Sequence, residues 1–293
     1  MRLSRSILAV AAVVCAGLTA IGTASPAVAA GVQFGGPIVV PNIPVPGAAG
    51  SPTGAASGGF TIPSYSLNWS GYAVQGGGQR FNYVSDTFTE PTVTCTGFGL
   101  SDSEWVGLDG LSDQTVEQDG TGAACAGPGY LTPYYRAWVE MYPQPSKSVF
   151  AVAPGDVISA SVKYGAGTFT LTIADLTSGA SYTETANCAT CARSSAEWIN
   201  ERPAWCNSAQ TKCALSALAD FSQTTKGYAV AGTDTSSPKP IGGFSPNYNL
   251  TMVNPITGGG FESLDTVGPL LGSAGSAFTT TWNRTGTPYP ITL

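Results

Sequence analysis

The sequence has 293 residues, of which 12 are lysine or arginine, 18 are aspartate or glutamate and none is histidine. The absence of histidine excludes Ser-His-Asp and Cys-His nucleophilic sites and the usual zinc hydrolase sites. The net charge of −6 argues against nucleic acid and anionic membrane surfaces as partners. We therefore expect any proton transfer by this chain to rest on carboxylates.

Residues 1–30 have the pattern of a secretory signal peptide. Arg2 and Arg5 precede an apolar run over residues 7–20, and Ala27-Val28-Ala29 supplies a small-x-small cleavage site. The run is too short for a membrane anchor, and no later segment is apolar enough to span a bilayer. The sequence therefore predicts a secreted, extracellular protein with no membrane association. Its net charge after cleavage is about −8, because two of the 12 basic residues are removed.

Residues 31–64 are rich in Gly, Pro, Ala and Ser, a composition that cannot supply a hydrophobic core. We interpret them as a linker or a removable pro-segment. Residues 65–293 are long enough for one large domain.

This domain has the pattern of an all-β protein. Between residues 168 and 173, Phe169, Leu171 and Ile173 alternate with threonines, which is typical of a half-buried strand. Similar short strands are separated by Gly-rich and Asn-rich turns, and residues 209–221 form the only plausible short helix. The fold class predicted is an antiparallel β-sandwich or jelly roll of two packed sheets.

Six cysteines lie outside the signal peptide, and an even number in an exported chain suggests up to three disulfides. Cys206 with Cys213 is the favoured pair, because the residues between them resemble a short surface loop. Cys188-x-x-Cys191 has the spacing of a redox or zinc half-motif. Without a second such motif or a histidine, a disulfide is the better interpretation, and no metal site is expected.

Three polar segments contain tryptophan: residues 105–120, 135–143 and 194–201. Alternate residues of a strand share a face, so each segment would present carboxylates and tryptophans together. The residues on these faces are Trp105, Gly107 and Asp109; Trp138, Glu140 and Tyr142; and Glu197, Ile199 and Glu201. Asn68-Trp69 adds another polar-aromatic pair. One face of this composition suits a ligand groove better than a core.

A simpler interpretation exists for each residue taken alone. A single Trp or Glu on a strand is usually part of ordinary surface packing. Residues 116–120 could also form a tight turn with Asp119-Gly120 at its apex. The coincidence of three such segments favours the groove.

The motifs W-V-G-L-D-G, T-V-E-Q-x-G, A-W-V-E-M-Y-P and A-E-W-I-x-E follow N-W-S-G in this order, from about Asn68 to Cys213. Together they resemble the glutamic peptidases, or eqolisins. The resemblance implies a lectin-like β-sandwich that cleaves peptide bonds at acidic pH with a glutamate and a glutamine. It also implies synthesis as a precursor, which fits residues 31–64.

Carried over by motif, the catalytic glutamate is Glu197 and the glutamine is Gln118. The residues that would line or support the substrate groove are Trp69, Trp105, Asp109, Trp138 and Glu140. The sequence departs from the fungal pattern in a loop one residue shorter before Gln118, which makes Gln114 a rival. Asp119 also adds a charge beside Gln118.

The chemistry of these side chains suits amide hydrolysis. Glu197 could remove a proton from water and return it to the leaving amine. The Gln118 amide could stabilise the oxyanion at any pH, since it does not titrate. A carboxyl with the ordinary pKa of about 4.3 works best in acid. We expect a monomer that acts on polypeptide substrates and needs no cofactor.

Two other classes of protein share this architecture. A glycoside hydrolase could use Glu140 and Glu197 as its carboxylate pair, with the tryptophans stacking on sugars. A carbohydrate-binding module would need the tryptophans but not Glu197.

Overall fold

The computed structural model describes most of the chain from residue 40 onward, and we restrict structural statements to that part. The described residues are 40–45, 53–54, 60–75, 77–126, 128–207 and 212–291. The predicted signal peptide lies outside them, as does most of the predicted pro-segment. Secondary structure in the described part is β-strand with two short 3-10 helices, Pro128–Tyr130 and Ile241–Gly243. No helix in this part is long and apolar enough to cross a membrane.

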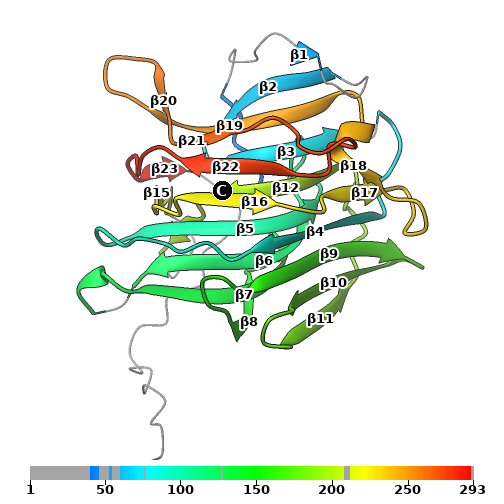
Figure 1. Cartoon of the computed structure of the whole chain (residues 1–293), viewed down its shortest axis with the longest axis horizontal. Coiled ribbons are helices and arrows are strands. Elements are labelled where there is room, and N and C mark those ends of the chain that lie inside the picture. The colour runs from blue at the N-terminus through cyan, green and yellow to red at the C-terminus, as the bar shows by residue number, and fades with distance from the viewer. Residues whose placement is uncertain are drawn as a thin grey trace, which may run out of the picture. The chain divides into compact units, whose positions relative to one another are not determined.

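The larger sheet carries all three polar segments found in the sequence. Its strands in spatial order are β1 (Thr53–Gly54), β2 (Phe60–Ser66), β19 (Asn247–Pro255), β3 (Trp69–Gln75), β12 (Ser195–Glu201), β5 (Leu100–Leu108), β6 (Val116–Cys125), β7 (Pro133–Tyr142) and β8 (Lys147–Ala151), with β15 (Ala217–Leu218) beside β5 and β20 (Phe261–Ser263) beside β19. Figure 1 shows this order from β2 to β8. Strands far apart in sequence are therefore neighbours at the centre of the sheet.

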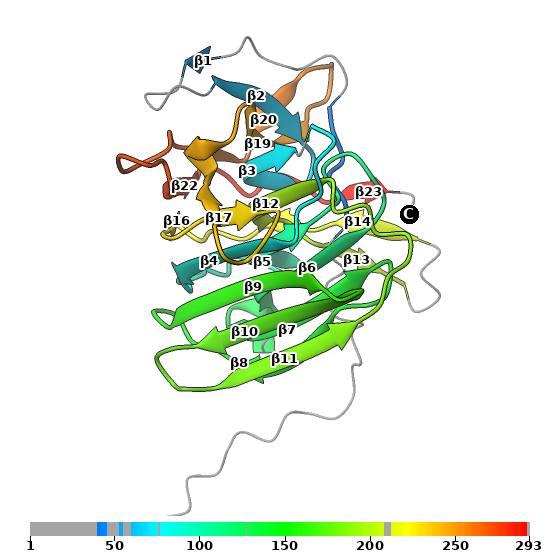
Figure 2. The same ribbon diagram turned by 90° about the vertical axis from the view of Figure 1, so that its right-hand side faces the viewer.

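A second sheet packs on one face of the first. Its strands in spatial order are β11 (Ser181–Ala186), β10 (Thr168–Asp175), β9 (Val157–Gly165), β4 (Tyr83–Thr89), β16 (Gln223–Lys226), β22 (Phe278–Trp282) and β21 (Asp265–Val267), with β17 (Val230–Gly232) beside β4 and β18 (Lys239–Pro240) beside β17. Figure 2 shows β4, β9, β10 and β11 side by side in this sheet. A small third sheet contains β13 (Ala204–Cys206), β14 (Cys213–Leu215) and β23 (Tyr289–Ile291).

The main hydrophobic core lies between the two large sheets. Alternate residues of the larger sheet supply one side of it, and the predicted alternation of β10 supplies part of the other. Its buried members include Val106, Leu108, Ala137, Val139 and Trp198 of the larger sheet and Val84, Phe88, Ile158, Val162, Phe169, Leu171 and Ile173 of the second. The prediction of an all-β sandwich is confirmed.

Three details of the sequence-based prediction differ from the structure. The sandwich is not wholly antiparallel, since β19 pairs in parallel with β2 and β15 pairs in parallel with β5. The helix expected within residues 209–221 is wrong, because Cys213–Leu215 and Ala217–Leu218 are paired strands. The turn considered for residues 116–120 is also wrong, since they begin the ten-residue strand β6. In the last two cases sheet pairing overrides a local preference.

Three disulfides fit the cysteine prediction. They join Cys95 to Cys125, Cys188 to Cys191, and Cys206 to Cys213. The favoured pair is confirmed, and the Cys-x-x-Cys motif forms a disulfide.

A buried ionic cluster lies on the inner side of the larger sheet. Lys226 Nζ lies 2.8 Å from Glu104 Oε2, and both side chains are 1% exposed. Asn200 Nδ2 donates to Asp102 and to Glu104 Oε1, each at 2.6 Å. Nearby, Asp86 accepts hydrogen bonds from the backbone of residues 227 and 228. These carboxylates have a cation, an amide or backbone N–H groups as partners.

Candidate active site

The register of the larger sheet brings the predicted catalytic residues into one row. Glu197 of β12 lies opposite Gly107 of β5, Gly107 lies opposite Gln118 of β6, and Gln118 lies opposite Glu140 of β7. Adjacent strands are about 4.8 Å apart, so two strand spacings put roughly 10 Å between the backbones of Glu197 and Gln118. All these side chains share the outer face of the sheet, opposite the second sheet. Figure 1 shows β12, β5, β6 and β7 in this order.

Gly107 lies between the two side chains in the row and is closely covered by its neighbours. A Cβ atom at this position would lie 2.9 Å from the ring of Trp105 and 3.2 Å from Gln118 Cβ. Any larger residue would therefore displace the candidate glutamine or the tryptophan beside it. The absence of a side chain at Gly107 therefore lets Trp105 and Gln118 pack against the backbone between Glu197 and Gln118.

Three tryptophans lie on this face of the sheet. The rings of Trp69 and Trp105 meet edge to face with centroids 4.9 Å apart. Trp138 lies on the other side of Gly120, which is paired with both Trp105 and Trp138. The three tryptophans are almost fully buried in one apolar cluster with residues such as Val116. This apolar cluster lies next to the row that contains Glu197, Gly107 and Gln118.

Gln118 is oriented by Glu140. Its Nε2 donates to Glu140 Oε2 at 2.8 Å, and both side chains are buried. One amide hydrogen remains available, since the side-chain amide carries two. The rival Gln114 lies in the exposed loop before β6, where its Nε2 donates to a backbone carbonyl. Only Gln118 shares a face with Glu197.

Glu197 is fully buried, and neither carboxylate oxygen has a hydrogen-bond partner of good geometry among the described residues. Burial raises its pKa well above the ordinary value, and the Ser195 hydroxyl offsets only part of this effect. Asp109, Asp113 and Glu117 raise the pKa further. This differs from the ordinary pKa expected from sequence, which applies to a hydrated carboxyl.

Glu201 lies on the same face as Glu197, but both of its carboxylate oxygens accept hydrogen bonds. Its Oε2 accepts from Trp105 Nε1 at 3.0 Å, and its Oε1 accepts from Asn68 Nδ2 at 3.2 Å. Burial still raises its pKa well above the ordinary value. Glu201 therefore fixes Trp105 and the Asn68-Trp69 segment in place, a function that the sequence pattern did not indicate.

Asp109 does not continue the strand face, in contrast to the sequence-based expectation. Strand β5 ends one residue earlier, and Asp109 has a φ of 71°. Its carboxylate accepts the backbone N–H groups of Arg193 and Ser194, each at 2.6 Å. Asp109 thus holds the segment that leads into the strand of Glu197.

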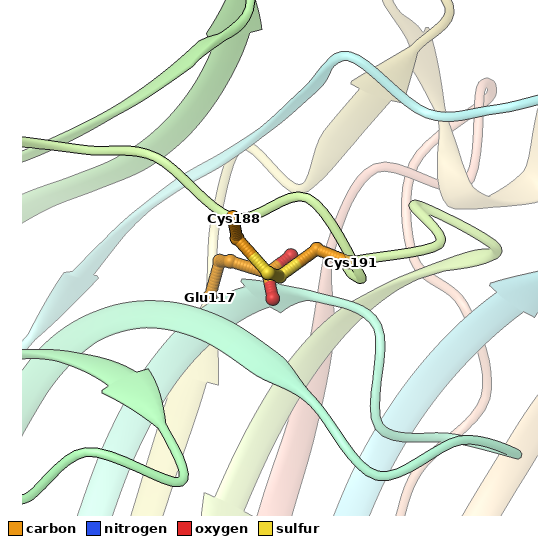
Figure 3. Close-up of side chains that lie close together, drawn as sticks. All are labelled: Glu117, Cys188 and Cys191. Atoms are coloured by element: carbon orange, nitrogen blue, oxygen red, sulfur yellow. A yellow bond between two sulfur atoms is a disulfide. The ribbon is translucent and has the colours of Figure 1, made fainter.

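Glu117 and the Cys188–Cys191 disulfide complete this support. The Glu117 carboxylate and both sulfur atoms lie within 4.8 Å of one another, and Figure 3 shows the carboxylate directed at the disulfide. Burial raises the pKa of Glu117 to about 10, with Asp109 as the next cause. A protonated Glu117 can donate to Asp109, so the two carboxyls can lie together without two charges. Since the sulfurs are bonded to each other, this group is not a metal centre in the oxidised chain.

Asp113 ties the loop after β5 to the same segment. Its carboxylate accepts from the backbone of Gly110 at 2.9 Å and from the Ser194 hydroxyl at 2.7 Å. Asp113 therefore ties the loop over residues 109–115 to the segment that leads into β12. Asp113 and Glu117 lie in the polar segment of residues 105–120, but the sequence analysis assigned no role to either of them.

The segment over residues 40–45 lies against the site. The N–H of its first residue donates to Glu201 at 3.3 Å, and the carbonyl of that residue accepts from Trp69 Nε1 at 2.9 Å. Asn42 donates from its backbone to the Gly110 carbonyl at 3.0 Å. The segment therefore packs on the same loop and tryptophan that surround Glu197.

The sequence model of the Peptidase A4 family matches residues 67–256. Among solved structures, the fold is similar to scytalidoglutamic peptidase with a peptide-based transition state analog, with a TM-score of 0.61 and 22% identity over 74% of this chain and 98% of that chain. It is also similar to SCP-B, a member of the eqolisin family in complex with the tripeptide Ala-Ile-His, with a TM-score of 0.59 and 21% identity over the same shares. No curated protein matches the chain by sequence.

The family match spans more than half of the chain and includes all the motifs that converge on the outer face. At this level of identity the two structures support the fold, and the family match supports the activity. The chain therefore belongs to the peptidase A4 family, the glutamic peptidases or eqolisins, which are hydrolases of peptide bonds.

Proposed function

We propose that the protein is a secreted endopeptidase that acts at acidic pH with Glu197 as general base and acid and Gln118 as oxyanion donor. The observation that carries this proposal is the shared row of the sheet, in which only Gly107 separates the two side chains. The tryptophan walls fit a polypeptide substrate with apolar side chains. No cofactor is needed for this chemistry.

In the proposed reaction, water between Glu197 and the scissile carbonyl carbon loses a proton to the Glu197 carboxylate as it attacks. The free amide hydrogen of Gln118 donates to the carbonyl oxygen as negative charge develops there. Glu197 then gives the proton to the leaving nitrogen, and the carbon–nitrogen bond breaks. Glu140 keeps the Gln118 amide in the required orientation through its 2.8 Å hydrogen bond.

The burial of Glu197 has a consequence for this mechanism. Its raised pKa means that the carboxyl is protonated in acid, whereas a general base must be ionised. Contact with water removes the desolvation that raises the pKa. We therefore propose that the active form has an open, hydrated Glu197.

Removal of the segment before the domain would open the site in this way. Residues 40–45 contact Glu201, Trp69 and the loop at Gly110. Strand β2 begins at Phe60, so a cut before this residue removes only the two-residue edge strand β1 from the larger sheet. We propose that residues 31–64 include a pro-segment and that residues 1–30 are removed on export.

The test is digestion of an unfolded protein from pH 2 to 7 by the chain beginning at Phe60, with and without an aspartic-peptidase inhibitor. The expected result is cleavage confined to acid that ignores the inhibitor and is lost in Glu197→Gln. The Gln114→Ala variant serves as a matched control that keeps activity. Cleavage retained in Glu197→Gln, or cleavage of a polysaccharide but not of protein, would contradict the proposal.

A further inference from the structure

The outer face continues beyond the Glu197 row along β6 and β7. The next row, two residues beyond Gln118 on β6, contains Trp105, Gly120 and Trp138. The row after that contains Ser103, Gly122 and Arg136. Arg136 is therefore four residues from Glu140 on its strand, or roughly 13 Å along the sheet. About four residues of extended peptide span this distance, so a substrate bound at Glu197 and Gln118 can reach Arg136.

Gly122 leaves a shallow gap at this end of the face. A Cβ atom there would meet only ordinary contacts, with Ser103 Oγ at 3.4 Å and Trp138 Nε1 at 3.5 Å. Trp138 is 4% exposed, and its Nε1 has no hydrogen-bond partner among the described residues. A buried indole N–H without an acceptor is costly, so it indicates a position for an acceptor that arrives from outside.

Arg136 stands directly across from Gly122. Its guanidinium stacks on the Tyr134 ring with the Cζ atom 4.7 Å from the ring centroid, and its Nε donates to the Tyr134 hydroxyl. The three ion pairs of the described part involve other residues, so Arg136 has no carboxylate partner there. The side chain is only partly buried, and the guanidinium carries four further N–H donors besides Nε–H.

The charge around this arginine is unusual for the face. The outer side chains of β12, β5, β6 and β7 include Glu197, Glu201 and Glu140, and Arg136 is the only cation among them in the described strands. The planar fork of a guanidinium matches the geometry of a carboxylate, to which it can donate two parallel hydrogen bonds. Trp138, two residues along the same strand, adds a second donor, since its Nε1 lies 3.5 Å from the position of a Cβ atom at Gly122.

We propose that Arg136, Trp138 and the gap over Gly122 form a substrate subsite that selects an acidic side chain within about four residues of the scissile bond. The subsite rests on the proposed peptidase function and adds a substrate class to it. Substrates with aspartate or glutamate at one defined position are cleaved faster than the same peptides with glutamine. Arg136 acts in specificity and takes no part in the bond-breaking steps.

The experiment uses the active chain and a set of peptides that share one cleavage site. An acidic, neutral or basic residue is placed in turn at each of four positions on either side of that site. Because aspartate and glutamate lose their charge near pH 4, cysteic acid is included as a probe whose sulfonate stays ionised in acid. The measured quantity is the ratio of kcat/KM for the acidic and the neutral peptide at each position.

The wild-type chain is expected to prefer the acidic peptide about tenfold at one position, which is typical of a charge-assisted hydrogen bond. The preference disappears in Arg136→Gln, reverses in favour of lysine in Arg136→Glu, and is reduced in Trp138→Phe. For aspartate it fades as the pH falls through about 4, while for cysteic acid it persists. Arg284→Gln removes an arginine that is paired with Glu262 and leaves the profile unchanged.

The outcomes separate the two proposals. Cleavage by the wild-type chain with no acidic preference, or with a preference that survives in Arg136→Gln, overturns the subsite and leaves the peptidase function standing. A wild-type chain that cleaves none of the peptides overturns the peptidase function, and the subsite falls with it.

Discussion

Two groups of buried carboxylates lie on opposite faces of the same sheet, and they differ in their hydrogen-bond and ion-pair partners. On the inner face, Glu104 has Lys226 at 2.8 Å and Asn200 at 2.6 Å. On the outer face, Glu197 is equally buried but has no hydrogen-bond partner of good geometry among the described residues. A buried carboxyl without partners destabilises the fold. The partners of Glu104 fit a structural role, whereas the lack of such partners at Glu197 fits the catalytic role that we propose for it.

The largest expected effect is on the inner group. Lys226→Met leaves Glu104 buried without its cation, which is expected to lower the free energy of unfolding by about 3–5 kcal/mol at neutral pH. Urea unfolding measures this change. Lys147→Met is the control, because Lys147 is 55% exposed and its pair with Glu184 contributes about 0.2–1 kcal/mol. Equal losses in the two variants would remove the distinction between the inner cluster and an ordinary surface pair.

The next effect is on the outer face. Gln118→Ala removes the proposed oxyanion donor and is expected to lower kcat by about 10²–10³-fold, as for other single donors of this kind. The adjacent control Gln114→Ala changes an exposed loop glutamine and should leave kcat within about twofold. A larger loss of kcat in Gln114→Ala than in Gln118→Ala would indicate that Gln114 is the oxyanion donor.

The pH dependence of stability sharpens the comparison further. Burial raises the pKa of Asp86 to about 7, that of Glu90 to about 8 and that of Asp265 to about 7. The folded state therefore binds protons more tightly than the unfolded chain, whose carboxyls titrate near pH 4. The stabilisation is fully present below pH 4 and is lost as the pH rises towards 8. We expect unfolding free energy to fall by at least about 2 kcal/mol over this range in urea titrations; a rise would contradict this.

The smallest expected effect concerns the loop that supports Glu197. Asp113→Ala removes acceptors for Gly110 and Ser194 and should lower the free energy of unfolding by about 1 kcal/mol. We expect a few-fold loss of kcat/KM as well, because the segment before β12 loses a tie to the loop. Ser112→Ala in the same exposed loop serves as the control, and an equal effect there would indicate general loop sensitivity.

Alternation in the sequence predicted the sandwich and the shared face of Glu197 and Glu201, because strand parity is a local property. It did not predict that Gly107 would separate Glu197 from Gln118, since the order of strands depends on pairings far apart in sequence. For the same reason it gave no partner for Glu104. Asp109 was placed on the strand face because parity alone does not show where a strand ends.

The most direct test compares two conservative variants, Glu197→Gln and Glu104→Gln, for both kcat/KM in acid and urea unfolding at neutral pH. Glu197→Gln is expected to lose activity by about 10³–10⁴-fold and to unfold at the same or a higher urea concentration, because an unpartnered carboxyl becomes a neutral amide. Glu104→Gln is expected to keep activity and to lose about 3 kcal/mol of stability, because Lys226 is left unpaired. The account is contradicted if Glu197→Gln remains active or if Glu104→Gln is as stable as the unaltered chain.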